Sequence, residues 1–180
     1  MDVDGKRLPA EAREAVRAHL AGEGRAGSLP GSKSGVFVTI TDSRGLRGCI
    51  GYAEPALPLH EALRLAAVAA ATEDPRFDPL RLEELDTVQF EVTVLDEPVL
   101  IRAGTPQEYI SSITPGRNGL MVRRGEASGL LLPQVAAEYG WSAREFLENT
   151  CRKAGLDPDS WTRPGTDVYR FGGRVFTEQG

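Results

Sequence analysis

The stretch GVFVTITDSRGLRGCIG, residues 35–51, predicts a β-hairpin and, with it, much of the fold. Its first half alternates between apolar and more polar residues, so that Val36, Val38 and Ile40 share one face of a strand. DSRG is typical of a turn, because aspartate starts turns and Gly45 can adopt a positive φ. LRGCIG is then the returning strand of the hairpin.

The returning strand places its only cysteine between two glycines. Alternation puts Arg47, Cys49 and Gly51 on one face, with Gly48 on the other. In one interpretation, Cys49 is a small core residue and the glycines make room for packing. In the other, Gly51 leaves a bare patch beside Arg47 and Cys49 that a ligand or another part of the backbone approaches closely. A cationic neighbour would also favour the thiolate form of Cys49.

The remaining elements are predicted by apolar periodicity, capping residues and turn residues. The connector between Gly22 and Gly31 is rich in glycine. Helices are expected at 9–21, 58–71, from Thr105, at 133–140 and at 142–155; strands at 87–95 and 167–176, with a second hairpin within 116–133. In the strand at 87–95, Gln89, Glu91 and Thr93 point outward or into a cleft. Because no βαβ rhythm appears, we expect an α+β fold, an antiparallel sheet with helices packed on one side.

Composition limits the classes of function. A chain of 180 residues is most simply one domain over residues 1–180, made of one unit or of two tightly joined subdomains. Two cysteines and no apolar signal segment predict a reduced, cytoplasmic setting. The apolar run at 62–71 is too short to span a bilayer, so no membrane partner is expected. The net charge of −5 argues against a dedicated nucleic-acid binder.

Two further places could belong to a site. Asp74, Arg76 and Phe77 lie in DPRF, a loop bracketed by prolines after a buried helix; they form either a functional loop or a turn in which Arg76 pairs with a carboxylate and Phe77 plugs the core. Gln134 lies in the first turn of a helix, where free backbone N–H groups could bind a polar ligand, although residue chemistry alone favours a solvated surface glutamine.

Nucleophilic catalysis by Cys49 would require a nearby base. The chain has only two histidines, His19 and His60, and neither spacing indicates a catalytic triad. The two cysteines and two histidines also lack the spacing of a structural zinc site. The sequence therefore predicts neither a metal nor a cofactor.

Four segments together resemble one known family. LRGCIGY, ATEDPRFDPL, GLLLPQVAAEYGW and TCRKAGL occur in this order and are similar to motifs of the AMMECR domain family, which includes protein A of the AmmeMemoRadiSam gene set. The resemblance covers residues 35–176. It implies an α+β fold with a larger and a smaller subdomain and a cleft between them. It also implies that the LRGCIG hexapeptide, residues 46–51, lies at or beside the functional surface.

The family resemblance implies a role in a shared pathway and does not imply a particular reaction. The family has no settled activity, and its neighbours by gene fusion and gene order are Memo proteins and radical SAM enzymes. We therefore expect a non-catalytic accessory protein that binds such a partner or a small-molecule ligand; the alternative is a small-molecule enzyme that uses Cys49 in an inter-subdomain cleft. The expected binding residues around one concavity are Arg47, Gly48, Cys49, Gly51, Asp74, Arg76, Phe77 and Gln134.

Overall fold

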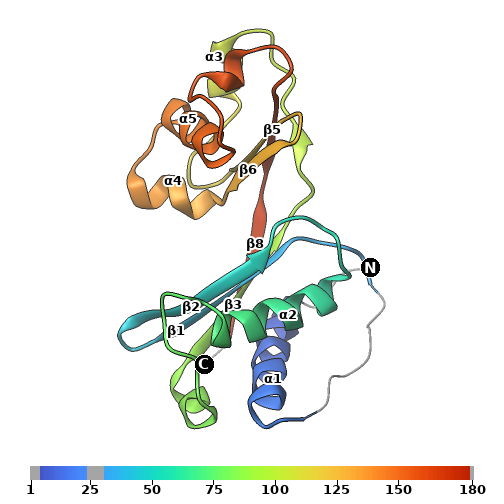
Figure 1. Cartoon of the computed structure of the whole chain (residues 1–180), viewed down its shortest axis with the longest axis vertical. Helices are drawn as coiled ribbons and strands as arrows, with labels where there is room; N and C mark the ends of the chain where they lie inside the picture. The colour runs from blue at the N-terminus through green and yellow to red at the C-terminus, as the bar shows by residue number, and fades with distance from the viewer. Residues whose placement is uncertain (1–4, 24–30, 179–180) are drawn as a thin grey trace. The chain divides into compact units, whose positions relative to one another are not determined.

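The computed structural model of the chain describes residues 5–23 and 31–178, so most of the connector predicted between Gly22 and Gly31 lies outside the described residues. The chain divides into two compact units (Figure 1). Unit 1 comprises Met1–Leu95 and Arg174–Gly180, and unit 2 comprises Asp96–Gly173. The chain therefore passes from unit 1 into unit 2 and returns to unit 1 for its last strand.

Unit 1 is built around a four-stranded sheet in the order β2-β1-β3-β8. Its strands are β1 (Val36–Asp42), β2 (Gly45–Tyr52), β3 (Gln89–Leu95) and β8 (Gly173–Thr177). The pairs β1–β2 and β1–β3 are antiparallel, which confirms the predicted hairpin. β2 lies at one edge of this sheet.

Two helices cover one face of this sheet, α1 (Leu8–Leu20) and α2 (Leu59–Thr72) (Figure 1). Val36, Val38 and Ile40 of β1 are buried against them, as the alternation predicts. Two short 3₁₀ helices, η1 (Gly5–Arg7) and η2 (Leu82–Thr87), precede α1 and β3. Because both α-helices lie on one face, the opposite face of the sheet carries the side chains of the alternate positions of β1, β2 and β3.

Unit 2 has its own four-stranded sheet, in the order β4-β7-β5-β6. Its strands are β4 (Val99–Leu100), β5 (Gly119–Arg124), β6 (Ala127–Leu131) and β7 (Asp167–Phe171). Its helices are α3 (Pro106–Ser111), α4 (Pro133–Tyr139), α5 (Ala143–Lys153) and the 3₁₀ helix η3 (Ser160–Thr162). α5 packs against the β5–β6 hairpin through Phe146 and Leu147, which are fully buried.

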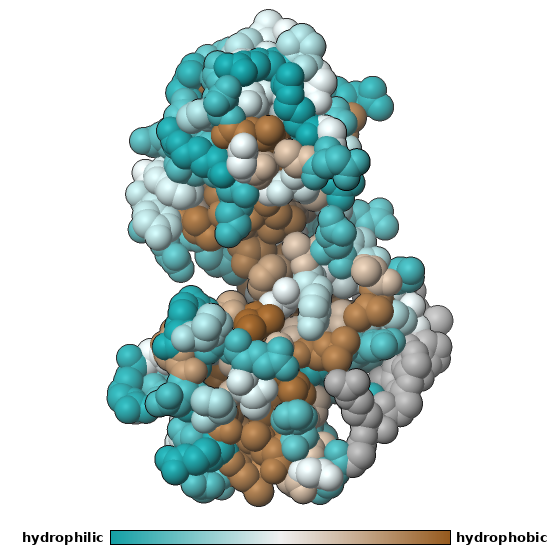
Figure 2. All heavy atoms as spheres, viewed as in Figure 1, coloured by the Kyte–Doolittle hydropathy of each residue, from teal (hydrophilic) through white to brown (hydrophobic). Residues whose placement is uncertain are grey.

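The predicted fold class is confirmed, an α+β fold with antiparallel strand pairs and helices. One element differs from the prediction. The segment 167–176 is not one strand, because the chain leaves β7 at Phe171, passes Gly172 and starts β8 in the other sheet. Within the described residues, no helix is long and apolar enough to cross a membrane. In the view of Figure 2, hydrophilic residues cover much of the rim of each unit.

Candidate functional site

The backbone of Cys49 is held by side chains from a distant loop. Cys49 lies on the edge strand β2, and its N–H donates to Asp74 Oδ2 at 2.9 Å. Arg76 Nη2 lies 3.4 Å from the Cys49 carbonyl oxygen. An edge strand normally leaves such groups open to water or to another strand. Here one carboxylate and one guanidinium take the place of a neighbouring strand.

Asp74 is the centre of this arrangement. It is 5% exposed, and Arg76 binds it in a bidentate pair, with Nε 3.0 Å from Oδ1 and Nη2 2.7 Å from Oδ2. The Arg76 backbone N–H also donates to Oδ1, which closes an Asx turn. The hydrogen bonds from the Arg76 side chain hold the pKa of Asp74 well below its usual range; the Cys49 and Arg76 amides add to this, and burial opposes it. Asp74 is therefore a carboxylate whose charge is used inside the protein.

The sequence of the loop explains why Asp74 reaches β2. α2 ends at Thr72, and Pro75 prevents the helix from continuing. The Phe77 N–H donates to the Asp74 carbonyl at 3.1 Å, so the chain turns at once. The Arg76 guanidinium lies over the Phe77 ring at 5.5 Å, and 55% of the Arg76 side chain stays exposed. The turn thus buries the carboxylate and presents the guanidinium.

Arg47 does not play the part that strand alternation predicts. The pairing of β1 with β2 shifts between Ile40 and Thr41, which leaves Arg47 as the extra residue of a bulge. Such a bulge redirects a side chain. The Arg47 guanidinium donates to the Asp78 carbonyl at 2.6 Å and to Glu84 Oε1 at 3.3 Å. It therefore ties β2 to the loop and to η2.

The glycines of the hexapeptide serve close packing. A Cβ atom on Gly48 would lie 2.0 Å from the Ala70 carbonyl oxygen of α2. A Cβ atom on Gly51 would lie 2.3 Å from the Val36 carbonyl oxygen and 2.5 Å from Cγ of Phe37. Both distances are too short for any side chain, so α2 can approach β2 only where Gly48 stands. The Phe37 ring occupies the space that Gly51 leaves.

The Cys49 thiol belongs to a polar row across the sheet. Its Sγ atom lies 3.4 Å from Thr39 Oγ1, and the Cys49 residue is half-buried. Thr39 is paired with Cys49 on β2 and with Glu91 on β3, so the three side chains stand side by side on the face that α1 and α2 leave uncovered. Glu91 was not among the predicted site residues. Its outward position in the alternating strand was the available signal.

The remaining predicted site residue, Gln134, lies in unit 2, and so does the second cysteine, Cys151. Gln134 is exposed in the first turn of α4, and Cys151 is buried in α5. Burial raises the pKa of the Cys151 thiol. Since the two units are described separately, the gathering of Gln134 with Cys49 around one concavity stays a prediction.

Histidines and metal ligands do not converge on Cys49 in the described part of the chain. His60 Nδ1 lies 2.7 Å from Glu11 Oε2, in a contact that joins α2 to α1. Residues 5–23 and 31–178 contain no group of three or more His, Cys, Asp or Glu side chains that could hold a metal ion. Glu91 lies next to Thr39, on the same face of the sheet as the Cys49 thiol. Its carboxylate is the group on this face that we consider for proton transfer.

The sequence profile of the AMMECR1 family matches residues 7–176. The chain belongs to the AMMECR1 family. A protein of Methanothermobacter thermautotrophicus is 50% identical over 183 residues, covering 98% of this chain and 95% of that protein. Protein NEQ441 of Nanoarchaeum equitans is 51% identical over 147 residues, covering 81% of this chain and 82% of its own length.

A solved structure extends the likeness to the fold. The crystal structure of the uncharacterized protein PH0010 from Pyrococcus horikoshii matches with a TM-score of 0.82 and 44% sequence identity. The match covers 96% of this chain and 90% of that chain. In this chain the hexapeptide, residues 46–51, lies on an edge strand, with the DPRF loop bonded to it.

Proposed function

We propose that this AMMECR1-family protein is a non-catalytic accessory protein that binds a partner or a ligand and acts with Memo-type and radical SAM proteins. The proposed contact surface surrounds Cys49 and lies in a cleft between the two subdomains. In this proposal the contact side chains are those of Arg47, Cys49, Asp74, Arg76, Phe77 and Gln134, and Gly48 and Gly51 contribute the close packing of the strand that carries Cys49.

The observation that carries the proposal is the bidentate Asp74–Arg76 pair bonded to the backbone of Cys49. It fixes an exposed guanidinium and an aromatic ring, Phe77, in one orientation. Arginine and aromatic side chains are enriched in interfaces, and a surface that is already ordered loses little entropy on binding. A rigid surface of this composition favours recognition.

The charged groups of the site also favour binding over chemistry. Arg47 is engaged by Asp78 and Glu84, and the charge of Asp74 is neutralised by Arg76. A general base must be free to take a proton near the operating pH. The depressed pKa of Asp74 makes it a poor proton acceptor at neutral pH.

The test is complex formation with the Memo-type and radical SAM proteins of the native host. We expect a complex whose dissociation constant rises about tenfold in Arg76→Ala, as for a moderate interface hot spot. Arg163→Ala is the matched control, because Arg163 also pairs with aspartates and is not one of the proposed contact residues. No complex with either protein, by mixing or by co-purification, would refute the proposal.

A second function is favoured by the row formed by Cys49, Thr39 and Glu91. The thiol of the half-buried Cys49 lies beside the Thr39 hydroxyl, and Thr39 is paired with Glu91, so the thiol is a candidate nucleophile with a route for its proton. In this alternative the protein is a small-molecule enzyme. Cys49→Ala should then abolish pathway turnover while leaving any complex intact. Full turnover in Cys49→Ala rules the enzyme out.

A further inference from the structure

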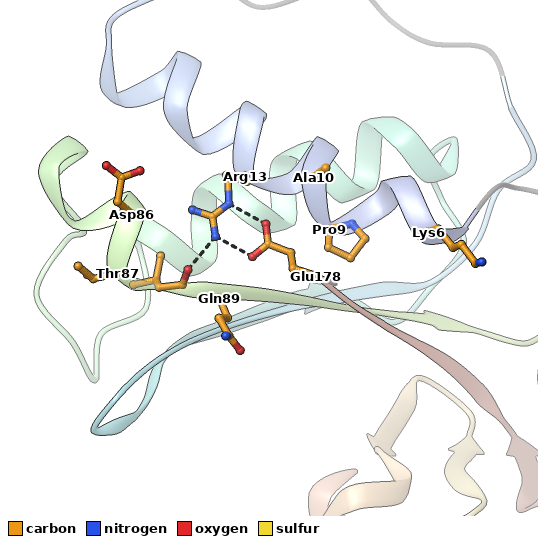
Figure 3. Close-up of a pocket in the computed structure, with 9 residues that line it drawn as sticks. Lys6, Pro9, Ala10, Arg13, Asp86, Thr87, Gln89 and Glu178 are labelled. Atoms are coloured by element: carbon orange, nitrogen blue, oxygen red, sulfur yellow. Dashed lines mark hydrogen bonds and ion pairs between the residues drawn. The ribbon is translucent and has the colours of Figure 1, made fainter. Parts of the chain in front are cut away.

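A groove runs beside α1 in unit 1, and none of the residues proposed above is among those that line it. It consists of two adjacent hollows with cavity volumes of about 570 and 390 Å³. They share Ala10, Arg13 and Asp86, and we call them together the α1 groove. The larger hollow by itself has a volume that is usual for a small-molecule site. It is lined by Lys6, Pro9, Ala10, Arg13, Asp86, Thr87, Val88, Gln89 and Glu178 (Figure 3).

Arg13 stands at the junction of the two hollows and binds a carboxylate there. Its Nε and Nη2 atoms each lie 2.6 Å from an oxygen of Glu178 (Figure 3). Its guanidinium also donates to the carbonyls of Leu85 and Val88. The Phe90 N–H donates to Glu178 Oε2 at 2.9 Å. The Glu178 carboxylate therefore receives a bidentate guanidinium and a backbone amide, which is how proteins recognise acidic ligands.

The walls of the groove offer apolar surface next to this charge. Pro9, Ala10 and Val88 line the larger hollow, and Leu82 and Leu85 line the smaller one. Leu82 is 46% exposed, so its side chain is open to contact with a ligand. An acid with an apolar body would therefore find contacts for both of its parts.

We propose that the α1 groove binds a small organic acid with an apolar body, and that Glu178 fills the carboxylate position in its absence. Glu178 lies one residue beyond β8, so its side chain can leave without opening the sheet. An incoming carboxylate would replace its bonds to Arg13 and Phe90 one for one. The exchange itself then changes the number of hydrogen bonds little, and apolar contact with the groove offsets the entropy that the incoming ligand loses.

The simpler account is that Arg13 and Glu178 only fasten the end of β8 to α1 and η2. The two accounts predict different results when Glu178 is removed. If the Arg13–Glu178 pair only holds β8 in place, removing Glu178 weakens the fold and creates no affinity for a carboxylate. If Glu178 occupies a ligand site, removing it raises the affinity of that site for a carboxylate.

The experiment is an NMR titration with hexanoate, using 1-hexanol as a probe with the same apolar body and no charge. In Glu178→Ala we expect hexanoate to bind about tenfold more tightly than in the wild type, with shifts at the Ala10 and Phe90 amides. Adding Arg13→Gln should cancel this gain. Asp157→Ala, which removes an arginine-paired carboxylate in unit 2, should bind as the wild type does.

Glu178→Gln provides a second test, because its amide oxygen can still accept a bond from Arg13 while its charge is gone. Its affinity for hexanoate should lie between those of the wild type and Glu178→Ala. If Glu178→Ala does not fold, Glu178→Gln is compared with the wild type, and it should bind hexanoate more tightly. Equal hexanoate affinity with and without the Glu178 charge, a gain that survives Arg13→Gln, or an equal gain for hexanol would overturn the proposal.

Discussion

At the scale of single residues, Asp74 links two parts of the chain that are far apart in sequence. One carboxylate accepts from the Cys49 amide, from the Arg76 amide and from the Arg76 guanidinium. A buried carboxylate is tolerated only when such bonds compensate for its lost hydration. The order of the site around Cys49 therefore depends on the ionised form of Asp74.

Asp74→Asn should lower the free energy of unfolding by about 2–3 kcal/mol at pH 7, since the amide cannot accept all of the hydrogen bonds that the carboxylate accepts. The pKa of Asp74 in the folded protein lies below the ordinary aspartate value of about 3.9 in the unfolded chain. Its contribution is therefore complete above about pH 5 and declines as the pH falls below about 4. Urea unfolding at pH 7 and at pH 3 measures the difference between wild type and variant. A difference that does not shrink at pH 3 would contradict this assignment.

The two cysteines should react very differently with iodoacetamide. Cys49 is half-buried, whereas Cys151 is fully buried and its thiol pKa is raised by burial. We expect labelling of Cys49 in the native protein and of Cys151 only after unfolding. Since Arg76, and not Arg47, holds the Cys49 carbonyl, Arg76→Met should slow the labelling of Cys49 about threefold, and Arg47→Met by much less. Mass spectrometry at timed intervals measures both rates, and an equal effect of the two substitutions would refute the distinction.

The sequence alone predicts part of this site. It singles out Cys49, Asp74 and Arg76, and it offers an Arg76–carboxylate pair as one interpretation of DPRF. It cannot place the Asp74 carboxylate on the Cys49 amide, because that contact joins residues 25 positions apart in the chain. It also cannot show the bulge that redirects Arg47, because a bulge depends on the register between two strands.

At the scale of secondary-structure elements, both units contain a hairpin whose returning strand carries a glycine against the end of a helix. In unit 1, Gly48 of β2 touches Ala70 of α2; in unit 2, Gly129 of β6 touches Ala154, the C-cap of α5. In each case a Cβ atom would lie within 2.5 Å of a backbone atom of the helix end. The same device sets the distance between helix and sheet in both units.

Gly48→Ala and Gly129→Ala should each destabilise the fold by about 1–3 kcal/mol, because the added methyl group meets backbone that cannot move aside. Gly104→Ala is the control, since its Cβ atom would lie 3.6 Å from the end of the Glu108 side chain. Chemical denaturation measures the cost. Hydrogen exchange should show the loss of protection in unit 1 for Gly48→Ala and in unit 2 for Gly129→Ala. Unchanged stability in either glycine variant would show that the helix adjusts freely.

Element boundaries follow from local signals where caps and turns are strong. The Ser142–Glu145 capping box starts α5, and Gly140, with φ +63°, ends α4, as the sequence predicts. The segment 167–176 could not be divided in advance, since β7 and β8 differ in the sheet that they join and not in their alternation. Membership of a sheet is decided by partners elsewhere in the chain.

At the scale of the whole molecule, two separate hydrophobic clusters support the two units. Among the residues that the structure describes, the buried cluster of unit 2 is made of residues between Ile101 and Val168. The buried cluster of unit 1 is made of residues between Leu8 and Val94, with Phe176 of β8 packed against it. Unit 2 is therefore continuous in sequence, whereas unit 1 is completed by a strand that arrives after unit 2.

This asymmetry predicts different behaviour of two fragments. Residues 96–173 should fold alone and unfold cooperatively, because no buried residue of their cluster comes from elsewhere in ranges 5–23 and 31–178. Residues 1–95 keep their buried cluster but lose β8. They should be less stable by at least about 2 kcal/mol, because Arg13 loses the carboxylate of Glu178 and β3 becomes an open edge. NMR spectra and urea unfolding measure both fragments. A fragment 1–95 as stable as unit 1 in the full chain would mean that β8 and Glu178 add little to the fold, while an unfolded fragment 96–173 would mean that unit 2 depends on unit 1.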